Sequence, residues 1–317
     1  MKGLCVFLMN SQPVFVLLFT QTSHEQKRMK LLIISHVSPW PGDSGQQLRV
    51  RYTLEVAVRA FQVDFLTIAP VGKRKEVEEQ LAASGCQPLV LSSRLINGSF
   101  SKLRFYIGAS LFALRTGMKD SNYQIGKLEL CPARIRSAIG PRDYDLVLYE
   151  YFHAVDSVSV FRNMGVPVIL DMHNVLWKSR KERLNEKAAW PAWLKRASLH
   201  RYRRGEETAW DQFDALIAIN RSEQDLIQAR LRPAQKLFYA PMGTDLSRWP
   251  ACWEPAKPLR LAYYGGLASP HNEAAALRCY ERVMPLIWQR IPDAELWLVG
   301  SNPTERLRRL TAILGSK

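Results

Sequence analysis

Short apolar runs alternate with helical segments along most of the chain, and this alternation limits the fold more than any other feature. From Leu31 onward the apolar runs lie at residues 31–35, 63–69, 88–92, 145–150, 166–172, 214–220 and 236–241. The first run, LLIIS, is what a strand buried on both faces of a sheet requires. Helical segments between the runs, such as the one from about Gln46 to Ala60, are typical of right-handed βαβ units around a parallel sheet.

The alternation of apolar runs and helical segments is interrupted at residues 244–258, which contain three prolines and two tryptophans. It resumes after residue 258. The new segment holds two apolar runs, LRLAYYG and AELWLVG, each followed by a helical stretch. We therefore predict an α/β protein of two Rossmann-like domains, the first at 29–243 and the second at 259–317, joined by a linker at 244–258. Nucleotide-binding sheets have about five or six strands, so we expect the second domain to be truncated.

Residues 1–28 precede the pattern and are expected to form an extension outside both domains. Their apolar stretch, Leu4–Thr20, is interrupted by polar residues and Pro13, and is too short and broken for a membrane span. We interpret Met29 as the natural start, with a weak N-terminal membrane anchor as the alternative. The five cysteines are widely spaced without a C-x-x-C pair, which suits a reducing compartment such as the cytoplasm.

A net charge of +15 predicts an anionic partner. Much of this charge lies between Lys178 and Arg204, where a solvated helix face and a surface for an anionic membrane are both open interpretations. Aromatic residues among the cations favour the membrane. Under that interpretation the contact residues are Trp177, Trp190, Trp193, Lys195 and Arg196. No nucleic-acid-binding motif accompanies the charge, so no nucleic-acid partner is predicted.

Polar residues that follow the strands form a candidate site at the carboxyl edge of the first sheet. His173 and Asn174 follow the strand at 166–172, and Glu150 closes the strand at 145–150. A histidine that caps the next helix is the alternative for His173, and Asn174 could itself be an N-cap. His36 and His153 are interpreted as loop residues.

The loop after the first strand carries Gly42 and Gly45 and leads directly into a helix. Backbone N–H groups at a helix N-terminus can bind phosphate, although a plain βα turn also favours glycine. Arg49, one turn into that helix, could add positive charge, but an exposed arginine is the commoner case. The sequence Asp143-Tyr144-Asp145 imitates a metal-binding D-x-D motif, but it precedes its strand. We expect Asp145 to be a strand-entry residue and predict no metal.

Several segments in order resemble the GT-B-fold glycosyltransferases of family 4, especially bacterial sugar transferases for cell-surface polysaccharide. The resemblance extends from about Met29 to Gly315. It is carried by KLLIISHVSPWPGDSGQQLR, YDLVLYEYF, VPVILDMHNVLW, FDALIAINRSEQD, FYAPMGTDLSRW and GGLASPHNEAAALRCYERVMPLIWQRIPDAELWLVGSNP. In that family a histidine at the place of His173 contacts the donor sugar near the cleaved bond. Gly265 and Gly266 lie where the family's donor-domain loop approaches the diphosphate, although a simple strand-end turn is equally consistent.

The resemblance implies transfer of a sugar from a nucleotide-sugar to a lipid-linked or glycan acceptor at the inner membrane face. The nucleotide-sugar would be a co-substrate, and no cofactor is expected. The sequence departs from the family in two ways: the loop GGLASPHNEAA has no Lys or Arg, and the family's paired glutamates are absent. Two other interpretations therefore stay open: a non-catalytic fragment or acceptor half that needs a complementary C-terminal chain, and a nucleotide-sugar epimerase.

Overall fold

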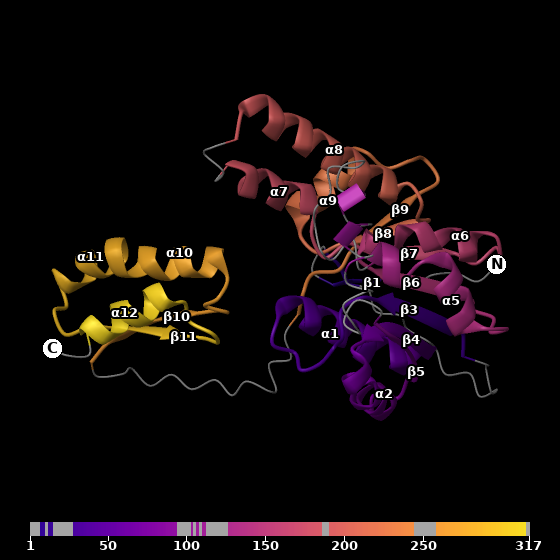
Figure 1. Cartoon of the computed structure of the whole chain (residues 1–317), viewed down its shortest axis with the longest axis horizontal. Helices are drawn as coiled ribbons and strands as arrows, with labels where there is room; N and C mark the ends of the chain where they lie inside the picture. The colour runs from indigo at the N-terminus through magenta and orange to yellow at the C-terminus, as the bar shows by residue number, and fades with distance from the viewer. Residues whose placement is uncertain are drawn as a thin grey trace. The chain divides into compact units, whose positions relative to one another are not determined.

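The structure is a computed structural model that describes residues 28–93, 126–185, 190–243 and 258–314, with short pieces at 7–9, 12–14 and within 103–111. The described residues divide into two compact units between Gly243 and Thr244 (Figure 1). The predicted linker lies outside the described residues except for its last position. Of the N-terminal extension, the structure describes Arg28 and an antiparallel pair, β1 (Phe7–Met9) and β2 (Gln12–Val14). Our interpretation of Met29 as the start of the chain is not tested by it.

The first unit is built on a seven-stranded, entirely parallel sheet, which confirms the predicted α/β class (Figure 1). The strands are β3 (Lys30–Ser35), β4 (Gln62–Ala69), β5 (Gln87–Ser92), β6 (Leu146–Glu150), β7 (Val168–Asp171), β8 (Ala215–Ala218) and β9 (Lys236–Tyr239). Their order in space is β5-β4-β3-β6-β7-β8-β9. The chain therefore winds outward in one direction from β3 and in the other from β6, which makes the β3–β6 boundary the topological switch point of the sheet.

Helices cover both faces of this sheet. They are α1 (Gly45–Ala60), α2 (Arg74–Ala83), α5 (Pro132–Ile139), α6 (Val158–Arg162), α7 (Leu176–Asn185), α8 (Ala192–Trp210) and α9 (Arg221–Gln228), with 3-10 turns η1 (Val71–Lys73) and η2 (Phe152–Ser157). Leu31 and Ile33 of β3 pack in the core shared with α1 and α2. Leu32 and Ile34 belong to the core on the other face, with α5, α6 and α8. The continuous apolar run of β3 is thus buried on both sides, as the sequence predicted.

The second unit contains two parallel strands, β10 (Arg260–Tyr264) and β11 (Glu295–Val299), together with α10 (Pro270–Arg278), α11 (Met284–Trp288) and α12 (Glu305–Leu314). The helical stretch predicted after LRLAYYG is not one continuous α-helix, because it changes to a π-helix at Cys279–Val283. The cause is local, because Pro285 has no N–H to continue the α-helical ladder.

One face of the β10–β11 pair is covered and the other is exposed. Tyr263 and Leu298 pack against a small core formed mainly by Leu267, Ala276, Leu277 and Leu307. On the opposite face the side chains of Tyr264 and Trp297 are 83% and 47% exposed. Parallel sheets are normally covered on both faces, so this exposed face is unusual for its strand type.

The Asp143-Tyr144-Asp145 sequence lies at the amino edge of β6, as predicted. The Asp145 carboxylate accepts a hydrogen bond of 2.8 Å from the backbone N–H of Lys30. The Tyr144 hydroxyl donates to the buried Asp64 carboxylate at 2.8 Å. Asp145 therefore fixes the entry of a strand at the edge opposite to the candidate site.

Candidate functional site

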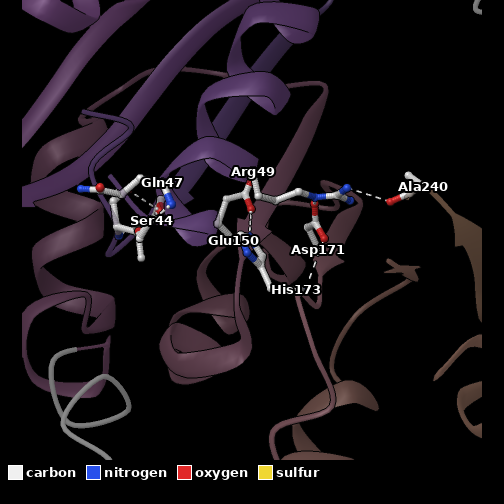
Figure 2. Close-up of polar contacts among 9 residues, drawn as sticks. Ser44, Gln47, Arg49, Glu150, Asp171, His173 and Ala240 are labelled. Carbon is white, nitrogen blue, oxygen red and sulfur yellow. Dashed lines mark hydrogen bonds and ion pairs between the residues drawn. The ribbon is translucent and has the colours of Figure 1, made fainter. Parts of the chain in front are cut away.

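Four charged or titratable side chains meet at the carboxyl edge of the sheet (Figure 2). Arg49 comes from α1, Glu150 ends β6, and Asp171 and His173 come from the end of β7. All four are buried, with exposed fractions of 8%, 2%, 1% and 3% in that order. We call them the His173 cluster. They lie beside the topological switch point, where ligands bind in open parallel sheets.

Arg49 joins three elements of this edge. Its Nε lies 2.9 Å from Oδ2 of Asp171, and its Nη1 donates to the carbonyl oxygen of Ala240, just after β9, at 2.7 Å (Figure 2). Because both charges are buried, loss of either partner would leave an unpaired buried ion at a large cost in folding free energy. The alternative of an ordinary exposed arginine is therefore wrong, because Asp171 and the Ala240 carbonyl hold the guanidinium inside the protein.

Glu150 and His173 form the second pair of the cluster. The Nε2 atom of His173 is in direct hydrogen-bonding contact with the Glu150 carboxyl group. Burial, and next the nearby Asp171 carboxylate, raise the pKa of Glu150, while His173 and Arg49 act in the opposite direction. A proton can therefore be held at the Glu150–His173 contact, where a carboxyl group and an imidazole can exchange it.

The backbone is strained at two non-glycine residues beside this contact. His173 has φ of 55°, and the N–H of Asn174 donates to the carbonyl of Met172 at 2.6 Å, which closes a three-residue γ-turn around it. Tyr151 has φ of 73° and ψ of 150°, a region that is normally restricted to glycine. The rings of Tyr151 and His173 stack with centroids 3.9 Å apart. Strain at two adjacent strand ends is typical of a functional site.

The glycine-bearing loop enters α1 through a capping arrangement. Ser44 is the N-cap and accepts a hydrogen bond from the N–H of Gln47, whose side chain accepts from the N–H of Asp43 (Figure 2). Gly42 has φ of 94°, so glycine is required there for the turn itself. Gly45 is the first residue of α1, and the N–H groups of the first turn have no partner within the helix. Binding of phosphate by these N–H groups stays a prediction from the sequence.

The remaining residues of the predicted site lie in different surroundings. Asn174 is exposed and lies before α7. His153, expected in a loop, is buried in η2, where its ring packs against His36 with centroids 4.8 Å apart. Burial lowers the pKa of His153 to about 3, with a smaller contribution from His173. His153 is therefore neutral at physiological pH.

Gly265 and Gly266 follow β10 in the second unit, in a turn organised by Asn272. The Asn272 side chain donates to the Gly266 carbonyl at 2.9 Å and accepts from the Tyr263 hydroxyl at 3.1 Å. A Cβ atom at Gly265 would lie 3.1 Å from the Asn272 amide nitrogen. Close approach by Asn272 is therefore a sufficient reason for glycine at 265, apart from any role in binding phosphate.

Glu150, Asp171 and His173 also have the residue types of a metal site, with potential ligand atoms within 4.8 Å of one another. Their existing contacts argue against it, because Arg49 already pairs with Asp171 and His173 already contacts Glu150. A cation here would have to displace a guanidinium. The arrangement is therefore better suited to proton exchange and hydrogen bonding than to metal binding.

The basic and aromatic residues predicted to contact a membrane lie on α7, on α8 and just before α8. Trp193 is 70% exposed and Arg196 is exposed, whereas Trp190 and Lys195 are half-buried. Trp177 packs against the core, and the Arg203 guanidinium lies 4.7 Å from its ring centroid. Trp193 and Arg196 are thus more available to a membrane than Trp177. Among the described residues, no helix is long and apolar enough to cross a bilayer.

Glu206 gives the first unit a pH-dependent stability. Its buried carboxyl accepts hydrogen bonds from the N–H groups of Leu176 and Trp177 at 2.8 and 2.7 Å. Burial raises its pKa to about 8, from about 4.5 in the unfolded chain, although these two N–H groups oppose the rise. The folded protein therefore retains a proton that the unfolded chain loses. We expect the free energy of unfolding to fall between about pH 5 and 8, by up to about 1.4 kcal/mol per pH unit.

Urea unfolding at pH 5.5, 6.5 and 7.5 measures this slope, and Glu206→Gln should reduce it. Some slope of the same sign should remain, because the pKa of Glu150 is also raised. An unchanged slope in Glu206→Gln would show that Glu206 does not carry the effect.

The fold is that of a Rossmann-like α/β protein, and the His173 cluster is the candidate site at the carboxyl edge of its sheet. Residues 74–243 match the family model of the glycosyl transferase 4-like domain. The match covers more than half of the chain, so the chain belongs to this family, as the sequence resemblance predicted. A comparison with curated proteins gives no match.

Solved structures show the same fold at low sequence identity. Sucrose-phosphate synthase from Thermosynechococcus elongatus superposes with a TM-score of 0.52 at 15% identity, covering 91% of this chain and 68% of that one. The glycotransferase of kitacinnamycin has a TM-score of 0.46 at 13% identity, with coverages of 86% and 65%. The chain thus spans about two thirds of the length of these proteins. The likeness to the synthase supports a GT-B type of fold.

Proposed function

We propose that this protein transfers a sugar from a nucleotide-sugar donor to a lipid-linked or glycan acceptor in cell-surface polysaccharide synthesis. The observation that carries the proposal is the His173 cluster, a buried group at the switch point of a sheet in a chain of the glycosyl transferase 4-like family. In this proposal residues 29–243 form the acceptor-side domain. Residues 259–317 contribute the beginning of the nucleotide-sugar domain, with Gly265 and Gly266 near the diphosphate.

The chemistry of glycosyl transfer explains why such a cluster is useful. As the bond to the nucleoside diphosphate breaks, negative charge develops on the leaving phosphate and positive character on the sugar ring. Fixed hydrogen-bond donors stabilise that charge, and the N-terminus of α1 after Gly42 and Gly45 can supply them. His173 contacts Glu150 and lies in a strained turn; in this proposal it hydrogen-bonds the donor sugar. Arg49 and Asp171 keep this edge of the sheet in position.

The proposed acceptor places the protein at the cytoplasmic face of the inner membrane, with Trp193 and Arg196 toward the lipid. We expect Trp193→Ala with Arg196→Gln to weaken sedimentation with anionic liposomes, and we expect added salt to weaken the wild type. Val71→Ala with Lys75→Gln is the matched control, because it removes an exposed apolar side chain and a cation from the region of η1 and α2. Equal binding by both double variants would refute the membrane contact.

A second candidate is the acceptor half of a split transferase that needs a complementary chain. The exposed face with Tyr264 and Trp297 favours it, because a partner chain could cover that face. Under this candidate the wild type should self-associate in sedimentation velocity, and Trp297→Lys should reduce the association. Leu286→Lys, an equally drastic change on an exposed helix position, should not. A wild type that stays monomeric at every concentration and transfers sugar alone would rule this candidate out.

A further inference from the structure

A basic pocket lies on α8 and involves none of the residues of the His173 cluster. Its volume is about 410 Å³, and it is lined by His200, Arg203, Arg204, Glu207 and Arg230. The first four come from α8, and Arg230 follows the end of α9. This volume lies within the range of small-molecule sites in proteins, about 300–1,000 Å³.

Glu207 holds two of the arginines side by side. Its buried carboxylate accepts from Nε of Arg203 at 2.6 Å and lies 3.2 Å from Nε of Arg230. The Arg203 guanidinium is also supported by the ring of Trp177. Two guanidinium groups would repel each other without a shared anion, so Glu207 fixes their positions in advance of any ligand. Such preorganisation lowers the entropy cost of binding.

The pocket retains positive charge and donors after these contacts are made. Three arginines face one glutamate, which leaves an excess of two positive charges among these four side chains. Glu207 engages the Nε atom of each paired arginine, so within the part of the chain that the structure describes the outer nitrogens of both forks stay available to another acceptor. Arginine forks match the geometry of phosphate oxygens with two parallel hydrogen bonds.

We propose that this pocket binds a phosphate or diphosphate group. The inference goes beyond the proposed transferase function, which assigns no ligand here, and it holds whether or not the chain transfers sugar. A soluble phosphate and a lipid phosphate headgroup share this chemistry. Trp193, Arg196, His200 and Arg204 recur at three- and four-residue spacing along α8, so an exposed indole lies on the same helix face as the pocket.

Calorimetric titration of the full chain with inorganic pyrophosphate tests the pocket directly. We expect Arg204→Gln with Arg230→Gln to weaken binding at least tenfold. Arg201→Gln, which removes an exposed cation from α8 outside the pocket, should bind like the wild type. Arg204→Lys with Arg230→Lys keeps the positive charges but removes the planar guanidinium groups. Its affinity for pyrophosphate should lie between that of the wild type and that of the double glutamine variant. Thermal unfolding of every variant confirms that the fold is retained.

Vesicles distinguish the two sources of phosphate. If a lipid headgroup fills the pocket, phosphatidic acid vesicles should bind the wild type and Arg201→Gln, fail to bind the double glutamine variant, and compete with pyrophosphate. If the ligand is soluble, pyrophosphate binding should depend on Arg204 and Arg230 while vesicle binding does not. The proposal would be overturned if the wild type did not bind pyrophosphate. It would also be overturned if the double glutamine variant and Arg201→Gln bound pyrophosphate with equal affinity.

Discussion

Replacing Arg49 with methionine should lower the free energy of unfolding of the first unit by about 3–5 kcal/mol. The guanidinium pairs with Asp171 at 2.9 Å, and both side chains are almost completely buried. Its loss leaves the Asp171 carboxylate buried, unpaired and close to the Glu150 carboxyl group. It also removes the hydrogen bond to the Ala240 carbonyl, which ties α1 to the end of β9.

Urea unfolding monitored by tryptophan fluorescence measures this loss. Arg51→Met is the matched control, because Arg51 lies two residues along the same helix and pairs with Glu55 at 3.0 Å near the surface. Such an exposed pair contributes about 0.2–1 kcal/mol. Asp171→Asn in the Arg49→Met background should restore part of the stability, since it removes the uncompensated charge. Equal losses in Arg49→Met and Arg51→Met would show that the pair is not buried as described.

His173→Ala should reduce the turnover of sugar transfer by about 10²–10³-fold, the usual effect of removing one fixed hydrogen-bond donor from a transition state. The fold should survive this change, because the imidazole is not part of the apolar core. Turnover is measured as nucleoside diphosphate release, and folding as the urea midpoint. His173→Gly separates the two effects, because glycine relieves the strained φ of 55° but supplies no donor. Wild-type turnover in either variant would remove His173 from the reaction.

Glu150→Gln tests whether the carboxyl acts through His173 as a positioning residue. The amide can still hydrogen-bond to Nε2, so the ring should stay in place, but it cannot exchange a proton. We therefore expect a smaller loss of turnover than in His173→Ala, together with a changed pH profile. An unchanged profile would show that the raised pKa of Glu150 has no part in the reaction.

The sequence predicted the sheet well because apolar runs report burial directly. Every predicted strand of the first unit is present, although β6, β7, β8 and β9 are each shorter than their apolar runs. The position of His173 and Glu150 was also predictable, since parallel strands all end at one edge. The start of α1 at Gly45 followed from the order of strand, glycine loop and helix.

The pairing within the site could not be predicted from the sequence. Arg49 and Asp171 are 122 residues apart, and only the winding of the chain around the switch point brings α1 beside the end of β7. The positive φ of Tyr151 and His173 could not be predicted either, because only a few per cent of residues other than glycine adopt it. Tertiary packing sets these conformations. The half-burial of Trp177 is likewise a result of tertiary packing, because the ring packs against the core and contacts Arg203 of another helix.

Release of nucleoside diphosphate from a panel of UDP-, GDP-, ADP- and dTDP-sugars, with a lipid-linked sugar acceptor, tests the central claim most directly. The full chain should release product from at least one donor, and His173→Ala should do so about 10²–10³-fold more slowly. The released sugar should appear on the acceptor, which separates transfer from epimerisation. Absence of release with every donor, or equal rates in the wild type and His173→Ala, would contradict sugar transfer at the His173 cluster.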